Sequence, residues 1–62
     1  MHEESYKGHH IRITTHEVRS AFQWSYQIDD ELPHRSNRRP LPEDAAIAEA
    51  LREATGVIDK MP

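Results

Sequence analysis

The chain of 62 residues predicts an α+β fold in which a three-stranded antiparallel β-meander carries one C-terminal amphipathic helix on one face. Two segments in the first half alternate apolar and polar residues, which is the period of a half-buried strand. After the proline-containing segment 40–42, apolar residues recur every three or four positions, which is the period of an amphipathic helix. We expect one small domain over residues 1–62, because the chain is too short for two cores.

Residues 6–16 form the first predicted strand. Ile11 and Ile13 share one face and the polar residues between them share the other, while β-branched Ile and Thr fit a pleated surface. Gly8 near the start of the strand indicates a β-bulge or a close backbone approach. Residues 1–5 are polar and unpatterned, so we expect them to be frayed.

Residues 21–29 form the second and most clearly patterned strand, since four large side chains alternate strictly with small or polar ones. The large side chains are Phe22, Trp24, Tyr26 and Ile28. Residues 17–20 are predicted to be the connecting turn, although the Asn-Gly or Asp-Gly pair typical of a tight hairpin is absent. After an acidic loop ending at Pro33, residues 34–39 are predicted to be a third, edge strand that its arginines protect from aggregation.

Residues 42–60 form the predicted helix. Pro42 suits the first turn, and the acidic residues after it complement the positive end of the helix dipole. Gly56 leaves two alternatives: the helix ends at Thr55, or it continues to Lys60 at a cost of about 1 kcal/mol for an interior glycine. The longer helix is favoured because the apolar stripe stays in phase beyond Gly56. The stripe comprises Ile47, Leu51, Ala54, Ile58 and Met61, widened by Ala46 and Ala50.

The predicted core is thin, since 35% of the residues are hydrophobic and a domain of about 60 residues buries only about 60% of its unfolded surface. A second copy of the chain is therefore a candidate partner. The helix is long for a small sheet, so we expect Ile58 and Met61 to overhang the sheet and to mediate self-association. The alternative is a monomer, because many domains of this size fold alone.

Several classes of protein are excluded by composition and spacing. The sequence has no cysteine, and its longest apolar run, residues 45–48, is far too short to span a membrane, so we expect a soluble cytoplasmic protein without membrane contact. His10 and His16 share a strand face but lie about 20 Å apart at about 3.3 Å per residue, so they cannot share a metal ion. We predict no metal, no cofactor and no catalytic residue, because no serine lies in a nucleophile-elbow motif either.

The uncovered face of the two clearly patterned strands carries hydrogen-bonding and basic residues and no acidic residue. Arginine suits phosphate contacts, and glutamine suits base edges. The net charge of −3 opposes nonspecific nucleic-acid binding. We therefore expect a non-enzymatic binding or interaction module, with a nucleic-acid-binding module as the alternative. The candidate contact residues are Arg12, Gln23, Gln27, Arg35, Arg38 and Arg39.

Two short motifs and the Ala- and Glu-rich helix resemble a group of small uncharacterised bacterial proteins with β-β-β-α organisation. The motifs are Tyr6-x-Gly8-His9-His10-Ile11 and Trp24-Ser25-Tyr26-Gln27-Ile28-Asp29. The resemblance covers nearly the whole chain and implies the fold without an activity. More loosely, the layout is similar to the amino-terminal DNA-binding domains of some phage integrases and to HicB-type antitoxins. That similarity implies a sheet-plus-helix fold and assigns no site residue.

Overall fold

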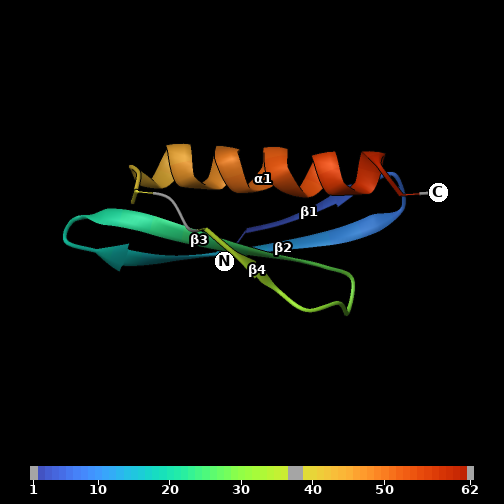
Figure 1. The fold of residues 1–62 in the computed structure, drawn as a ribbon, viewed down its shortest axis with the longest axis horizontal. Coiled ribbons are helices and arrows are strands. Elements are labelled where there is room, and N and C mark those ends of the chain that lie inside the picture. Colours follow the sequence, from blue (N-terminus) through green and yellow to red (C-terminus); the bar gives the residue numbers. More distant parts are fainter. Residues whose placement is uncertain (1, 37–38, 62) are drawn as a thin grey trace.

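The computed structural model describes residues 2–36 and 39–61, which form a four-stranded antiparallel sheet with one helix packed on one face (Figure 1). The strands follow one another in the order β1-β2-β3-β4, and the helix lies along the long axis of the molecule. The predicted α+β fold with a C-terminal helix is confirmed, and the sheet has one strand more than predicted. The elements are β1 (His2–Tyr6), β2 (His9–Val18), β3 (Ala21–Ile28), β4 (His34–Arg35) and α1 (Glu43–Asp59).

The additional strand, β1, replaces the frayed segment predicted for residues 1–5. It pairs with β2 through a two-residue turn in which Lys7 and Gly8 have φ angles of 50° and 82°. Two successive positive φ angles are typical of the type I′ turn, whose twist matches that of a hairpin. Gly8 is therefore a turn residue rather than a bulge. The prediction failed because β1 is an edge strand with few buried residues, and such a strand carries little apolar alternation.

The hairpin of β2 and β3 forms the centre of the sheet. Ile11 pairs with Ile28 and Ile13 with Tyr26, so the apolar residues of both strands lie on the helix side, as predicted. The strand β2 extends to Val18, and only Arg19 and Ser20 form the turn, with φ angles of 51° and 69°. The turn is shorter than the predicted segment 17–20. A two-residue turn of this kind needs the left-handed conformation at both positions, which is found mainly at Gly, Asn and Asp, and here an arginine and a serine adopt it.

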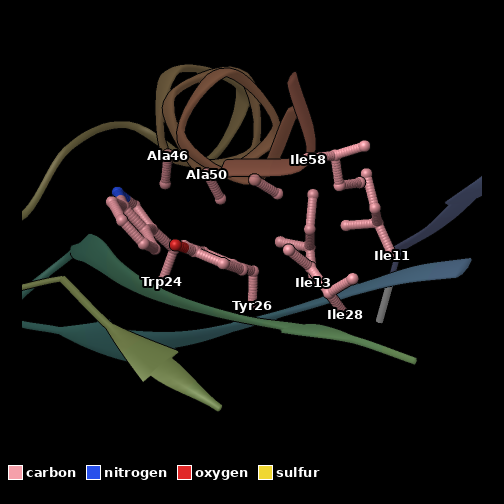
Figure 2. Close-up of a cluster of buried hydrophobic side chains, with 9 residues drawn as sticks. Ile11, Ile13, Trp24, Tyr26, Ile28, Ala46, Ala50 and Ile58 are labelled. Carbon is pink, nitrogen blue, oxygen red and sulfur yellow. The ribbon is translucent and has the colours of Figure 1, made fainter. Parts of the chain in front are cut away.

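The core lies between the helix side of the sheet and one stripe of α1 (Figure 2). The indole of Trp24 is only 6% exposed, stacks on Tyr26 with ring centroids 5.8 Å apart, and donates a hydrogen bond from Nε1 to Oε1 of Glu49 at 3.1 Å. The sheet therefore contributes most of the bulky side chains of the core, and the helix contributes three alanines and Ile58. The buried residues are Ile11, Ile13, Trp24, Tyr26, Ile28, Ala46, Ala50, Ala54 and Ile58.

The helix continues through Gly56 to Asp59, which confirms the longer of the two predicted alternatives. Its innermost residues recur every four positions at Ala46, Ala50 and Ala54, whereas Ile47 and Leu51, which were expected to centre the stripe, are only partly buried. The alanines rather than the large aliphatic residues therefore face the sheet most directly. Small side chains fit there because the rings of β3 already fill the space between the helix and the sheet.

The edge beside β3 is interrupted. Of the predicted strand over residues 34–39, His34–Arg35 form β4, Ser36 and Arg39 lie outside any strand, and residues 37 and 38 lie outside the described residues. The His34 ring stacks on Tyr26 with centroids 5.1 Å apart. The chain then returns to β3 at Leu41, which exchanges two backbone hydrogen bonds of 2.7 and 2.8 Å with Phe22. This arrangement covers the β3 edge in two short pieces, which leaves no long strand there for another chain to pair with.

A substitution in α1 tests the close approach of the helix to the sheet. Ala50→Leu adds three carbons at a fully buried position and should lower the free energy of unfolding by about 1–3 kcal/mol through overpacking. Ala45→Leu, at an exposed position of the same helix, should change it by less than about 0.5 kcal/mol. Urea denaturation measures both values, and equal effects of the two variants would contradict the packing described.

The two glycines provide a matched pair that tests the backbone. A β-carbon at either Gly8 or Gly56 would meet no atom within 4 Å, but only Gly8 has a positive φ. Gly56→Ala should therefore raise the free energy of unfolding by about 0.5–1 kcal/mol, because glycine weakens a helix interior. Gly8→Ala should lower it by about 1–2 kcal/mol. Thermal unfolding followed by circular dichroism measures both variants. A shift of the unfolding midpoint in the same direction for both would contradict this prediction.

Candidate functional site

The face of the sheet opposite α1 is uncovered and polar (Figure 1). Its members follow from the strand registers, because directly paired residues share a face and successive residues alternate. None of them is buried. We call this surface the open face, and it consists of Glu3, Ser5, His10, Arg12, Thr14, His16, Val18, Ala21, Gln23, Ser25, Gln27 and Arg35.

Three successive cross-strand pairs at the centre of the open face consist entirely of hydrogen-bonding side chains. They are Arg12 with Gln27, Thr14 with Ser25, and His16 with Gln23. Arg35 of β4 pairs with Ser25 from the other side. The structure thus brings four of the predicted contact residues onto one surface, namely Arg12, Gln23, Gln27 and Arg35. Two hollows lie along the same side of the sheet.

The first hollow has a volume of about 320 Å³ and lies over the middle of the β2–β3 hairpin. Arg12 and Gln27 line it together with Thr14, Ser25, Tyr26 and Pro33. The Gln27 side chain is oriented by a hydrogen bond of 2.9 Å from Nε2 to the backbone oxygen of Glu31. The hollow therefore has a guanidinium, an amide and two aliphatic hydroxyl groups within one small area, beside a tyrosine.

The second hollow, of about 500 Å³, lies at the β2–β3 turn, where Arg19 and Arg39 flank Val18, Ala21 and Pro40. Arg39 was among the predicted contact residues, whereas Arg19 was missed, because its role depends on the chain returning past the turn near Leu41. Arg38, also predicted as a contact, lies outside the described residues. We call the described arginines along this side the arginine row: Arg12, Arg35, Arg39 and Arg19.

The arginine row is electrostatically uncompensated. Within residues 2–36 and 39–61, no carboxylate forms an ion pair with any of its four guanidinium groups; the cations of the ion pairs are Lys7 and three histidines. The strands β2 and β3 place no acidic residue on the open face, as predicted, but the added strand β1 places Glu3 there. Its Oε1 lies 2.7 Å from Nε2 of His10. Four guanidinium groups against one carboxylate still make this side cationic in a chain of net charge −3.

The histidines of the described residues do not gather into a metal site, as no group of three His, Cys, Asp or Glu side chains there could hold an ion. One histidine instead joins β2 to the end of β3: His9 Nδ1 lies 2.8 Å from Asp29 Oδ2, and the His10 N–H donates to Asp29 Oδ1 at 3.0 Å. The backbone hydrogen bond from His10, followed by the His9 side chain, lowers the pKa of the Asp29 carboxyl.

The residues predicted to overhang the sheet do not do so. Ile58 is only 4% exposed and belongs to the core, and Met61 is partly buried against it. The helix lies along the sheet, so its C-terminal turn stays above β2 and β3 instead of projecting beyond them (Figure 1). Ile58 is therefore not available for contact with a second copy. The exposed apolar side chains at this end are Leu32 and Val57.

Comparisons with family models, with curated proteins and with solved structures find no match to this chain. The resemblances drawn from the sequence therefore stay predictions. No helix within the described part of the chain is long and apolar enough to cross a membrane.

The Asp29 contacts predict a specific acid response. Because the folded state lowers the pKa of Asp29 below 3.8, the stabilisation is present above that pH and is lost as the pH falls through the lower folded-state value. Asp29→Asn should weaken the fold at neutral pH and reduce the loss of stability below pH 3.8. Part of the loss should remain, because Lys7 and Tyr6 lower the pKa of Asp59 in the same way.

Urea titrations across this pH range measure the effect. Asp30→Asn is the matched control, since Asp30 is exposed and accepts no hydrogen bond from the described residues. An Asp29→Asn variant with the full acid dependence of the wild type would contradict the assignment.

Proposed function

We propose that this protein is a small non-enzymatic binding module whose contact surface is the open face. The observation that supports this most directly is the asymmetry of the sheet: α1 covers one face, and the other gathers hydrogen-bonding side chains with the uncompensated arginine row. The absence of cysteine from the sequence favours a reducing compartment, and we place the module in the cytoplasm.

A binding role is favoured over catalysis by the chemistry of the two hollows. Ser25 and Thr14 are the aliphatic hydroxyl residues of the central hollow, Tyr26 is its phenolic one, and neither a histidine nor a carboxylate lines it with them. A hydroxyl nucleophile needs a base within hydrogen-bond reach. The carboxyl groups whose pKa values are lowered by hydrogen bonds, Asp29 and Asp59, belong to structural contacts outside the lining of both hollows. Burial raises the pKa of Tyr26, which lines the central hollow, so its hydroxyl stays protonated at neutral pH and supplies no base.

The partner favoured by these side chains is a nucleic-acid duplex. Guanidinium groups bind phosphates, and the amides of Gln23 and Gln27 match the hydrogen-bonding edges of bases. The described open face has no Phe, Trp or Tyr residue, and its only rings are the imidazoles of His10 and His16, so it offers little of the stacking platform typical of single-strand binding. The β2–β3 hairpin is two strands wide only toward its turn, because β1 pairs with residues 9–13 of β2 and β4 with Ser25 and Tyr26. A two-stranded ribbon of this kind fits a major groove about 12 Å wide.

The second candidate partner is a protein with an acidic surface, which would use the arginine row without the glutamines. The two partners would use the amides of the central cross-strand pairs differently. Base edges require both the donor and the acceptor of an amide, whereas carboxylates require donors only. Gln23→Ala and Gln27→Ala should therefore reduce discrimination among duplex sequences but leave binding of an acidic peptide largely unchanged.

Titration of a fluorescent random-sequence duplex, followed by anisotropy at several salt concentrations, tests nucleic-acid binding. We expect binding at low salt that weakens as salt rises, because phosphate neutralisation releases counterions. Arg12→Ala and Arg35→Ala should each reduce the slope of log K against log salt by about 1. Lys60→Ala, at the exposed end of α1, is the control and should leave the slope unchanged. No binding at low salt would exclude a nucleic-acid partner.

A further inference from the structure

The turn end of the β2–β3 hairpin carries an apolar pair on the otherwise polar open face. Val18 lies opposite Ala21 as the last cross-strand pair before the turn, and the three pairs behind it are polar. Both side chains are half-buried and line the hollow of about 500 Å³ at the turn. This end of the hairpin therefore suits a partner group that is itself apolar.

Cations flank the apolar pair. Arg19 lies in the turn itself, and Arg39 reaches the same hollow because Leu41 pairs with Phe22 at the outer edge of β3. Among the residues that the structure describes, neither guanidinium group has an ion-pair partner and no carboxylate lines the hollow. The adjacent Glu17 lies on the helix side of β2. The hollow thus places apolar side chains between two uncompensated cations.

The partner that matches this hollow has an apolar group recessed between anions. The major groove of duplex DNA lies between two rows of phosphates, and the C5-methyl of thymine is the apolar group that base edges display there. Uracil lacks this methyl group, and the major groove of an RNA helix is too deep and narrow for side chains to read. Charge and polarity at the turn therefore favour thymine-containing DNA over RNA.

The neighbouring cross-strand pair adds an amide whose groups are all available. Gln23 lies opposite His16 on the open face, and its side chain makes no hydrogen bond with the described residues. Gln27, in contrast, already donates from Nε2 to the backbone oxygen of Glu31. A bidentate contact with N6 and N7 of adenine uses both the oxygen and the NH₂ of an amide. Gln23 is therefore the better placed of the two glutamines for adenine.

We propose that the turn end of the β2–β3 hairpin recognises A·T base pairs of duplex DNA, with Val18 and Ala21 against a thymine methyl and Gln23 on an adenine. Residues two apart on one strand face are separated by about 6.6 Å, and base pairs rise by about 3.4 Å. The two contacts therefore lie about two base-pair steps apart, and Arg19 and Arg39 bind phosphates at the rims of the groove. This inference rests on the proposed function and names its partner more narrowly.

Replacement of thymidine by deoxyuridine is the test, because it removes only the methyl group. The probes are two short fluorescent DNA duplexes of the same sequence with a central A·T run, one with thymine and one with uracil, titrated at low salt and followed by anisotropy. We expect the wild type to bind the thymine duplex about fourfold more tightly, which corresponds to about one buried methyl group. An RNA duplex of the same sequence should bind more weakly than both.

The outcomes separate this inference from the function on which it rests. Equal binding of the thymine and uracil duplexes, or binding of the RNA duplex as tight as that of the thymine duplex, would overturn the inference and leave the proposed function intact. Binding to none of the three duplexes at low salt would overturn both.

Variants of the apolar pair test the thymine contact. Val18→Ser should bring the affinities for the two DNA duplexes close to each other, because the methyl group then meets a hydroxyl. Val57→Ser makes the same change at the valine of α1 that is 37% exposed and should keep the fourfold preference. If Val18→Ser fails to fold, Ala21→Ser tests the same contact. A folded Val18→Ser variant with the full preference would refute the assignment.

The two glutamines provide a matched pair for the adenine contact. Gln23→Ala should reduce the preference for the A·T run over a G·C run by about tenfold, because a bidentate contact is lost. Gln27→Ala should reduce it by less, since the Gln27 amide is already engaged with Glu31. The same titrations measure both variants, and a larger effect of Gln27→Ala would contradict the assignment of adenine to Gln23.

Discussion

The packing of the aromatic row of β3 against the alanine stripe of α1 is the contact on which the rest of the structure depends. The rings of Trp24 and Tyr26 stack on each other between the sheet and the helix, and Ala46 and Ala50 give the helix a surface that can lie close above them (Figure 2). The indole is also fixed by its hydrogen bond to Glu49. Because one helix covers only one face, this contact determines both which face is buried and which remains open to a partner.

The elements with strong hydrophobic periodicity could be predicted from the sequence. The alternation in β3 and the three- or four-residue spacing in α1 each identify a buried face, and the phase of the stripe identifies the longer helix through Gly56. The strand β1 could not be predicted, because His2, Glu3 and Glu4 lie at an edge where little side-chain area is buried. The centre of the helix stripe was also misplaced, since alanine carries a weak apolar signal until its large neighbours are known.

In the candidate site, too, the residues on strands with strong alternation could be predicted, and those placed by the course of the chain could not. Arg12, Gln23 and Gln27 follow from alternation alone, because their neighbours Ile13, Trp24 and Ile28 are evidently core residues. The positions of Arg35 and Arg39 depend on where β4 pairs and where the chain returns to β3, and neither is encoded in local periodicity. Glu3 lies on the open face because β1 pairs with β2, which the sequence did not predict. Arg19 belongs to the site because it lines the same hollow as Arg39.

The charge distribution gives the two sides of the molecule different roles. Carboxylates are frequent along α1, whereas the arginine row follows the open side of the sheet. A chain of net charge −3 can thereby present a cationic surface to an anionic partner, as the proposed function requires.

The most direct measurement of the central claim is the set of nuclear Overhauser effects between the helix and the sheet. The account predicts strong effects from the methyl groups of Ala46 and Ala50 to the ring protons of Trp24 and Tyr26, and none from these methyls to Thr14 or Ser25 on the open face. An absence of contacts between the alanine methyls and either ring, with the Trp24 indole as accessible to a quencher as free tryptophan, would contradict it.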